Sequence, residues 1–373
     1  MKQNKIWLSS PHMGGAEQNY VNEAFDTNWI APLGPNVNGF EQDLQEYLSQ
    51  NVHVAALSAG TAALHLALKL AGVTKNDLVL CQSMTFSASA NPITYQGATP
   101  VFVDSEKDTW NMSPELLKKA IKDLIEKGRK PKAIIVVHLY GMPAKMKEIM
   151  AIADSYDIKV IEDAAESLGS RIDKQATGTF GNYGILSFNG NKIITTSGGG
   201  ALITQTEADK NKAVFWATQA RDNAPHYQHS EIGYNYRMSN IVAGIGRGQM
   251  EVLDLRIEQR RANYDFYLKE LSNLPIQVAP AEPKGYFSNR WLSTILTDSY
   301  KTREKIRLAL EKENIEARPL WKPMHLQPVF KDAPAYTNGV SEDLFNRGLC
   351  LPSGSNLTDK DRDRIIKAIK EVF

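Results

Sequence analysis

The stretch VHVAALSAGTAALHLALKLA, residues 52–71, decides the fold because it joins a short apolar strand to an apolar helix. Residues 52–57 predict a buried strand, and residues 60–71 predict a helix that covers it. Between them, Ser58-Ala59-Gly60-Thr61 supplies backbone N–H groups at a helix start, where a phosphate binds readily. An ordinary strand-to-helix turn with a polar cap is the alternative interpretation of these four residues.

The same alternation of short apolar strands and helices continues along the chain. Strands are expected at residues 52–57, 78–82, 100–104, 133–139, 159–163, 185–188 and 201–204, and helices at 40–49, 60–71, 86–95, 114–127, 145–156 and 211–221. This pattern predicts an α/β fold whose seven-stranded, mostly parallel sheet is covered by helices on both faces. Ligands of such sheets bind at the carboxyl ends of the strands, which directs attention to Ser58–Thr61, Ser83–Phe86, His138 and Asp163.

The segments outside this alternation predict an N-terminal arm and a second, smaller domain. Residues 1–40 are predicted to form an irregular arm with one helix at 17–27. One long helical stretch is expected from residue 240 to about 271, followed by a Pro-rich loop, strands at 291–296 and 315–318, and helices at 302–314 and 358–373. We therefore expect a large domain, residues 1–250, and a small α+β domain, residues 251–373.

The composition argues against several functional classes. The 373 residues contain 43 Lys and Arg against 42 Asp and Glu, and this balance favours neither nucleic acid nor an anionic membrane as a partner. The chain has no apolar run of the roughly 20 residues that a membrane helix needs, and its start does not resemble a signal peptide. Cys81 and Cys350 lie in or beside apolar runs, so we expect them to be reduced and buried in a cytoplasmic protein. No metal site is expected, because His226 and His229 have no third ligand cluster nearby.

Lys192 is the first candidate for chemistry. It lies in the stretch SFNGNKIITTSGGG, residues 187–200, among small polar residues and without an acidic neighbour. A lysine held in a pocket in this way can act as a nucleophile towards carbonyl carbons. A tight loop that carries a surface lysine is the alternative.

Asp163 and Phe86 each end a predicted strand and extend the candidate site. A buried carboxylate can keep the ring nitrogen of pyridoxal phosphate protonated, and an aromatic side chain can stack on the ring. The simpler alternatives are a helix cap for Asp163 and a core side chain for Phe86. Together with Lys192 and the turn at Ser58–Thr61, the two residues suit a pyridoxal phosphate site.

Several motifs carry a resemblance to a known family. They are Pro11–Gly15, Glu162–Gly169, Gly178–Gly181, Ser187–Lys192, Ser197–Gly200, Gly233–Ser239, Ser288–Trp291 and Arg318–His325. In these motifs, over essentially its whole length, the chain resembles the DegT/DnrJ/EryC1/StrS family of sugar aminotransferases. The resemblance implies the type I fold of pyridoxal phosphate enzymes, as in aspartate aminotransferase, with pyridoxal 5′-phosphate as cofactor.

The resemblance also implies residue roles. Lys192 would attach the cofactor and move the proton between cofactor and substrate carbons, and Asp163 would pair with the ring nitrogen. The other cofactor contacts would come from Ser58, Gly60, Thr61, Phe86, Glu166, Ser187, Asn189 and, across a dimer, Asn235. Nucleotide-sugar contacts would come from Met13, Trp29, Ile30, Arg237, Arg290 and His325. Many family members carry Gln or His at the position of Glu166, and a carboxylate there would repel the cofactor's phenolic oxygen unless it is protonated or turned away.

Within the family, the chain looks most like enzymes that aminate C4 of a UDP-linked 4-keto-6-deoxy-N-acetylhexosamine, as in bacillosamine synthesis. L-Glutamate would be the amino donor and leave as 2-oxoglutarate, and a homodimer with shared active sites would be the functional unit. A dTDP-linked keto sugar is an alternative acceptor. A sugar dehydratase of the same fold is a second alternative, although those relatives carry histidine at the lysine position. A non-catalytic binding protein with the same fold is a third alternative.

Overall fold

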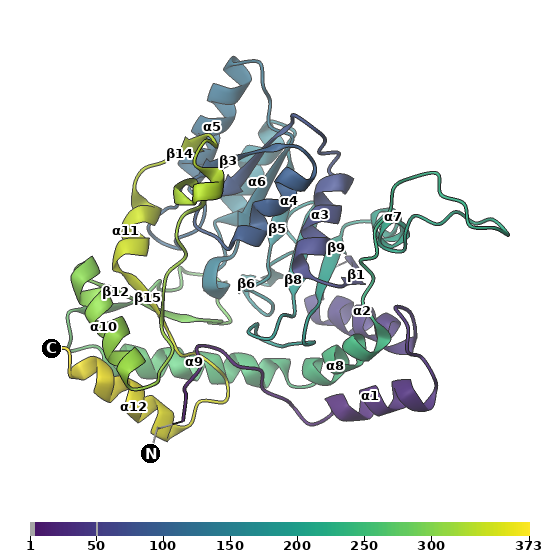
Figure 1. The fold of residues 1–373 in the computed structure, drawn as a ribbon. Coiled ribbons are helices and arrows are strands. Elements are labelled where there is room, and N and C mark those ends of the chain that lie inside the picture. Colours follow the sequence, from purple (N-terminus) through teal and green to yellow (C-terminus); the bar gives the residue numbers. More distant parts are fainter. Residues whose placement is uncertain (1–3, 50) are drawn as a thin grey trace.

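The computed structural model describes residues 4–49 and 51–373, and its centre is one large sheet (Figure 1). The strand order is β1-β9-β8-β5-β4-β2-β3-β14. The bounds are β1 (His53–Leu57), β9 (Gly200–Thr204), β8 (Tyr183–Ser187), β5 (Lys159–Asp163), β4 (Ala133–Val137), β2 (Leu78–Gln82), β3 (Thr99–Val103) and β14 (Ala335–Tyr336). Strand β9 is antiparallel to both neighbours, whereas the other pairs are parallel. The expected mostly parallel sheet is confirmed, and β14 from the C-terminal region adds a short eighth strand.

Helices cover both faces of this sheet because neighbouring strand residues point to opposite sides. In β4, Ile135 packs into the cluster that contains α3, whereas Ile134 and Val136 pack into the cluster that contains α5 and α6. One face is covered by α3 (Gly60–Leu70), α4 (Asn91–Tyr95) and α7 (Glu207–Ala217), and the other by α2 (Pro35–Leu48), α5 (Pro114–Glu126) and α6 (Met146–Ser155). The strands are thus buried on both faces, which explains their continuous apolar runs.

The C-terminal region builds a second, antiparallel sheet of order β10-β12-β15-β13. Its strands are β10 (Ile276–Ala279), β12 (Ser293–Thr297), β15 (Gly348–Leu351) and β13 (Arg318–Pro319), and its helices include α10 (Tyr300–Lys312), α11 (Val340–Arg347) and α12 (Asp359–Lys370). A small sheet, β11 (Tyr286–Phe287), β6 (Arg171–Ile172) and β7 (Gln175–Ala176), joins the two regions. The N-terminal arm also reaches the C-terminal region, since Ile6 bridges to Ile315. The division at residue 250 stays a prediction.

Two stretches that are each expected to form one helix are interrupted in the structure, and two other helices begin earlier than expected, α2 at Pro35 and α7 at Glu207. The stretch expected as one helix from 240 to 271 is α8 (Asn240–Met250) followed by α9 (Leu253–Glu270), with a break at Val252 (φ −118°, ψ 8°). The break lets α8 lie against α1 (Glu17–Asp26) and α2, while α9 runs on to the C-terminal region (Figure 1). The expected helix 86–95 is a 3-10 turn, Ser87–Ser89, followed by α4, because Pro92 has no N–H for a continuous helix.

Two further expectations concern the cysteines and the membrane. Cys81 and Cys350 are both free and buried, as expected. Within the described residues, no helix combines the length and the apolar character needed to cross a membrane.

Candidate active site

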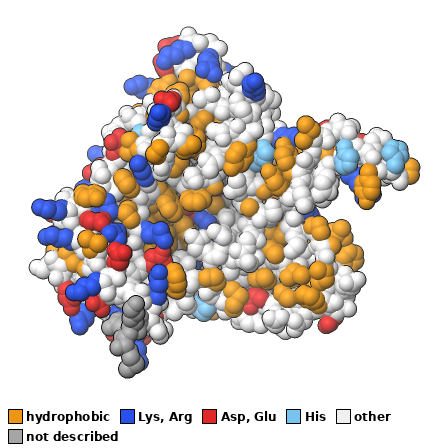
Figure 2. Space-filling view, in the orientation of Figure 1, with side chains coloured by type: hydrophobic (Ala, Val, Ile, Leu, Met, Phe, Trp, Pro, Cys, Tyr) orange, Lys and Arg blue, Asp and Glu red, His pale blue; other side chains and the backbone are white. Residues whose placement is uncertain are grey.

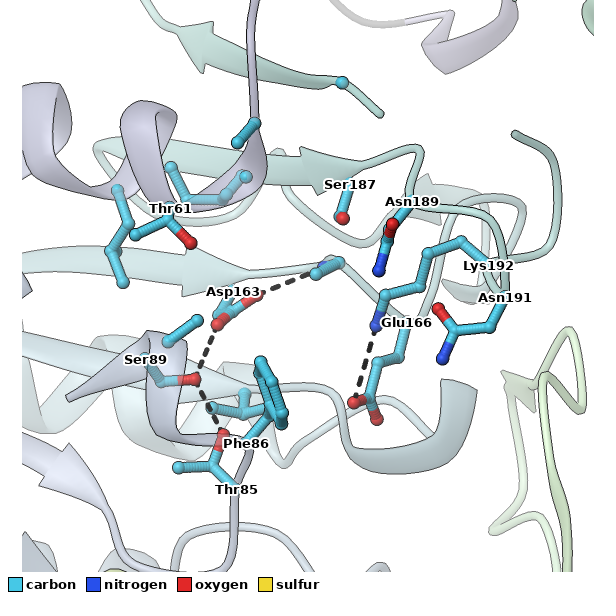
Figure 3. Close-up of a pocket in the computed structure, with 18 of the residues that line it drawn as sticks. Thr61, Thr85, Phe86, Ser89, Asp163, Glu166, Ser187, Asn189, Asn191 and Lys192 are labelled. Atoms are coloured by element: carbon cyan, nitrogen blue, oxygen red, sulfur yellow. Dashed lines mark hydrogen bonds and ion pairs between the residues drawn. The ribbon is translucent and has the colours of Figure 1, made fainter. Parts of the chain in front are cut away.

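A cavity of about 230 Å³ lies where the carboxyl ends of β1, β5 and β8 meet the start of α3. Its lining includes the predicted cofactor residues Ser58, Gly60, Thr61, Phe86, Asp163, Glu166, Ser187, Asn189 and Lys192. Figure 3 shows the side chains of Thr61, Asp163 and Lys192 arranged around one pocket. The structure therefore brings together residues that the chain separates by more than a hundred positions.

The amine of Lys192 lies inside this cavity and is largely buried. Its Nζ is 3.7 Å from Glu166 Oε1 and 4.1 Å from the ring centroid of Trp291. The loop before it is tight, because the Lys192 N–H donates to the carbonyl oxygen of Asn189 at 2.9 Å. A carboxylate and an aromatic face both attract an ammonium group, so these two contacts help to hold the amine in the cavity.

Asp163, the last residue of β5, is held by a chain of hydroxyl groups. Ser89 Oγ donates to Asp163 Oδ2 at 2.6 Å, and Thr85 Oγ1 lies 2.7 Å from Ser89 Oγ (Figure 3). The Ala165 N–H donates to Asp163 Oδ1 at 3.2 Å. Because these donors hold both oxygens in place, the carboxylate is oriented before any ligand binds. Ser89 carried no recognisable signal in the sequence, since Ser89 lies in a segment expected to be an ordinary helix.

Glu166 is a buried carboxyl that faces Lys192. The Tyr140 N–H donates to its Oε2 at 2.6 Å. Burial raises the pKa of Glu166 above its ordinary value, while the charge of Lys192, the Tyr140 N–H and the nearby Trp321 indole lower it. Glu166 lines the cavity with its carboxyl turned towards the lysine, and its contact with the cofactor stays a prediction.

The start of α3 has the features of an anion-binding site. Ala59 precedes the helix in an extended conformation, and no side chain of the described residues caps it. The first N–H groups of a helix have no partner within that helix, so they are free for a phosphate. A Cβ on Gly200 would lie 2.3 Å from Gly60 N, so only a glycine lets β9 pass this close to the helix start. Gly200 therefore allows β9 and the start of α3 to pack closely together.

Aromatic side chains form one wall of the cavity. Phe86 is 53% exposed, and its ring lies 5.6 Å from that of Trp321. Tyr140 stacks between Trp321 and Trp291, with centroids 5.9 and 6.4 Å away. Trp291, Trp321 and Asn191 line the cavity but were not predicted as site residues, although each ends or lies within a quoted family motif.

The predicted substrate residues of the N-terminal segment lie on the surface. Met13, Trp29 and Ile30 are exposed and are not among the described lining residues of the cavity. Asn235, predicted to reach a second subunit, is also exposed and accepts a hydrogen bond from Gln219 Nε2 at 3.1 Å. Because these four side chains are exposed, a second chain could reach them, and their roles stay predictions.

The remaining predicted substrate residues are engaged elsewhere. Arg237 pairs with Glu41 and donates to the Ala56 carbonyl. Arg290 is buried; its guanidinium donates to the Pro280 carbonyl at 2.7 Å and packs over the Tyr264 ring. His325 is linked through Nδ1 to Ser83 Oγ at 2.7 Å and through Nε2 to Glu342 Oε1 at 3.2 Å. Within one chain the structure does not bring these three side chains into the cavity, and their substrate contacts stay predictions.

The arrangement fits pyridoxal phosphate on its own chemistry. An amine for covalent attachment, an oriented carboxylate, an uncapped helix start and an exposed aromatic ring surround one cavity. These are the groups needed to hold the cofactor's aldehyde, ring nitrogen, phosphate and ring face, respectively. Lys192, Asp163, the turn at Ser58–Thr61 and Phe86 would supply them.

Comparisons with known proteins agree with this geometry. Residues 11–370 match the DegT/DnrJ/EryC1/StrS aminotransferase family. The chain is 54% identical over 374 residues to the “Putative pyridoxal phosphate-dependent aminotransferase EpsN” of Bacillus subtilis (strain 168), with 99% of this chain and 96% of that protein covered. It is 38% identical over 368 residues to the GDP-perosamine synthase of Escherichia coli O157:H7, with 99% and 98% covered.

Solved structures give the same result. A DegT DnrJ EryC1 StrS aminotransferase from Brucella abortus matches with a TM-score of 0.89 and 32% identity, with 95% of each chain covered. The PLP form of Spr1654 from Streptococcus pneumoniae matches with a TM-score of 0.90 and 25% identity, with 99% of this chain and 98% of that chain covered. The chain therefore belongs to the DegT/DnrJ/EryC1/StrS aminotransferase family and is a pyridoxal phosphate-dependent sugar aminotransferase.

Proposed function

We propose that this enzyme transfers an amino group from L-glutamate to C4 of a UDP-linked 4-keto-6-deoxy-N-acetylhexosamine. The product would be a UDP-4-amino sugar for surface glycan or glycoprotein biosynthesis. The observation that carries the reaction type is the position of Lys192 Nζ in a cavity shared with Asp163 and the start of α3. The acceptor rests on the resemblance of the sequence motifs to C4-aminotransferases.

The residues divide the chemistry among them. When bound, pyridoxal phosphate would supply a carrier for the amino group and a ring that acts as an electron sink. Lys192 Nζ removes the proton from the amino-bearing carbon of glutamate and later delivers a proton to C4 of the sugar. Asp163, held by Ser89, keeps a positive charge on the ring nitrogen. Phe86 and the tryptophan wall restrict water on one side of the cavity.

A GDP-linked 4-keto sugar is a second candidate acceptor. The relatives named GDP-perosamine synthase are 38%, 33% and 35% identical to this chain over nearly its whole length, which favours a GDP sugar. A dTDP-linked keto sugar is a third. A dehydratase function is disfavoured, because Lys192 stands where the resembling dehydratases carry histidine.

We further propose a cytoplasmic homodimer that shares its active sites. Figure 2 shows hydrophobic side chains gathered over the α1 region and on the segment that projects after α7. The exposed members include Trp29, Ile30, Leu33, Tyr227 and Ile232. A second copy would cover these side chains and bring Asn235 towards the neighbouring cavity. Sedimentation equilibrium tests the assembly, and a monomer at micromolar concentration would rule the shared site out.

The substrate is tested by a panel of UDP-, dTDP- and GDP-linked 4-keto-6-deoxy sugars, with and without a 2-acetamido group. Each is incubated with the enzyme and L-glutamate, and the product is followed by mass spectrometry and NMR. The proposal predicts the highest kcat/KM for the UDP-linked acetamido sugar, with the amine at C4. Preference for a GDP sugar would replace it with the second candidate, and NMR gives the axial or equatorial orientation of the amine.

A further inference from the structure

Arg260 is a buried cation without a carboxylate partner in the described part of the chain. It lies in the middle of α9 and is 1% exposed, and its pKa is lowered by burial and by the cation Arg256, with no carboxylate among the groups that shift it. Burying a charge without an opposite charge is costly unless several hydrogen bonds compensate. Such an arrangement calls for a reason beyond the stability of α9.

The hydrogen bonds of Arg260 give that reason. Nη1 donates to the carbonyl oxygens of Trp291 at 2.6 Å and Ser353 at 3.3 Å. Nη2 donates to Ser9 Oγ at 3.0 Å and to the carbonyl oxygen of Lys192 at 3.2 Å. The acceptors come from the N-terminal arm, the lysine loop and two segments of the C-terminal region. One planar guanidinium therefore fixes four distant segments relative to one another, and a lysine ammonium lacks the forked geometry to do so.

These bonds hold Lys192 from two directions. Its backbone carbonyl is bound directly by Arg260, and its amine lies over the ring of Trp291, whose own carbonyl is bound by the same guanidinium. The preceding residue is fixed as well, since Trp291 Nε1 and Ser9 Oγ both donate to the Asn191 carbonyl at 2.7 Å. Of the described partners of Arg260, Lys192 belongs to the segment Asn191–Lys192, and Trp291 and Ser9 both contact that segment.

We propose that Arg260 is a positioning residue that sets the place of Lys192 Nζ in the cavity, through the Lys192 carbonyl and the ring of Trp291. Arg260 is not among the described residues that line the cavity. The inference rests on the proposed role of Lys192 in attaching the cofactor. A purely structural role would lower stability without a selective effect on the lysine, whereas a positioning role affects the reactivity of the amine even where the protein stays folded.

The test compares Arg260→Lys with Arg303→Lys. Arg303 lies in α10, is 3% exposed, and binds the Asn346 carbonyl and Glu304, away from the cavity. Wild-type enzyme loaded with pyridoxal phosphate is first reduced with borohydride and mapped by mass spectrometry. A label at another lysine would reject the role of Lys192 itself, so that failure is distinguished from failure of the Arg260 inference.

Two rates are then measured on folded, cofactor-free variants. The rate of pyridoxal phosphate attachment, followed by absorbance, should fall roughly ten- to hundredfold in Arg260→Lys, because a small displacement of a reacting group has that effect. Labelling of Lys192 by acetic anhydride should become severalfold faster, because the amine leaves the Trp291 ring. Neither rate should change more than twofold in Arg303→Lys.

Ser9→Ala provides a second test of the inference in case Arg260→Lys does not fold. Ser9 is near the surface, and the substitution removes one bond to Arg260 and one to Asn191. Attachment should slow about threefold, with kcat reduced and the KM for the sugar unchanged. The positioning role is overturned if Arg260→Lys folds and shows both rates at wild-type values. If Arg260→Lys does not fold, the role is overturned when Ser9→Ala attaches the cofactor at the wild-type rate.

Discussion

Lys192 Nζ lies 3.7 Å from Glu166 Oε1, so the amine expected to attach the cofactor has a buried carboxyl as its neighbour. The pair couples two protonation states. While Lys192 is charged it stabilises the ionised carboxylate, and once the amine is neutral Glu166 loses that support in a buried environment. Burial, which raises the pKa of Glu166, is then no longer opposed by the lysine charge, and we expect a protonated carboxyl that would not repel the cofactor's phenolic oxygen.

Replacing Lys192 by alanine should abolish turnover. Because the side chain is the proposed attachment point and proton carrier, the rate of amino transfer should fall by at least about a thousandfold. Steady-state assays with glutamate and the preferred keto sugar measure this. A purified Lys192→Ala enzyme that works at the wild-type rate would refute the assignment, and unchanged thermal unfolding would show that the fold is intact.

Glu166 should make stability depend on pH. Burial raises the pKa of Glu166 above its unfolded value of about 4.3, so the folded state holds a proton that the unfolded chain has released. The stability of the wild type relative to Glu166→Gln should therefore be greatest below about pH 4.3 and decline as the pH rises through the folded pKa. Urea unfolding of the cofactor-free proteins across this range measures the difference.

The same experiment in the Lys192→Met background provides the control. Without the opposing charge of Lys192, burial raises the pKa of Glu166 further, so the decline with pH should be larger. A difference between wild type and Glu166→Gln that does not vary with pH would contradict the coupling.

Asp163→Asn should lower turnover while leaving cofactor attachment possible. An amide cannot stabilise a positive ring nitrogen, and the loss of such electrostatic support reduces rates on the order of a hundred- to a thousandfold. Stopped-flow measurement of the glutamate half-reaction separates this effect from attachment. If Asp163→Asn reacts with glutamate as fast as the wild type, Asp163 has another role.

Ser89→Ala should have a smaller effect on the same half-reaction. It removes the hydroxyl that donates to Asp163 Oδ2 at 2.6 Å, and a hydrogen bond to a charged group contributes about 1.5 kcal/mol, roughly tenfold in rate. Ser87→Ala, in the same 3-10 turn, is the matched control and should react at the wild-type rate. Equal rates for the two variants would mean that Ser89 does not support Asp163.

Gly200→Ala should weaken cofactor binding through the start of α3. The new Cβ would lie 2.3 Å from Ala59 C and Gly60 N, so the anion-binding turn must shift, at a cost of about 1–3 kcal/mol in stability. In Gly198→Ala the new Cβ meets nothing within 4 Å among the described residues, and stability should change by less than about 0.5 kcal/mol. Thermal unfolding and cofactor titration compare them, and equal affinities would contradict this view of the turn.

Much of the large sheet could be predicted from local patterns. Strands β2 and β5 have the expected bounds, because a fully buried strand is a continuous apolar run that ends in polar residues. The ends of the strands also predicted the cavity, since parallel strands present their carboxyl ends at one edge. The break between α8 and α9 could not be predicted, because the sequence is helical on both sides of Val252 and only packing against α1 and α2 separates them.

The sequence by itself determined the alternating α/β architecture, and its motifs predicted that Lys192 and Asp163 serve one cofactor site. These follow from runs and motifs in which neighbouring residues carry the information. Only the tertiary structure decided that Glu166 faces the amine, that Trp291 and Trp321 form the cavity wall, and that Arg260 binds the Lys192 carbonyl. Such contacts join segments far apart in the chain, and they form where the packing of both regions brings the side chains together, which no local pattern encodes.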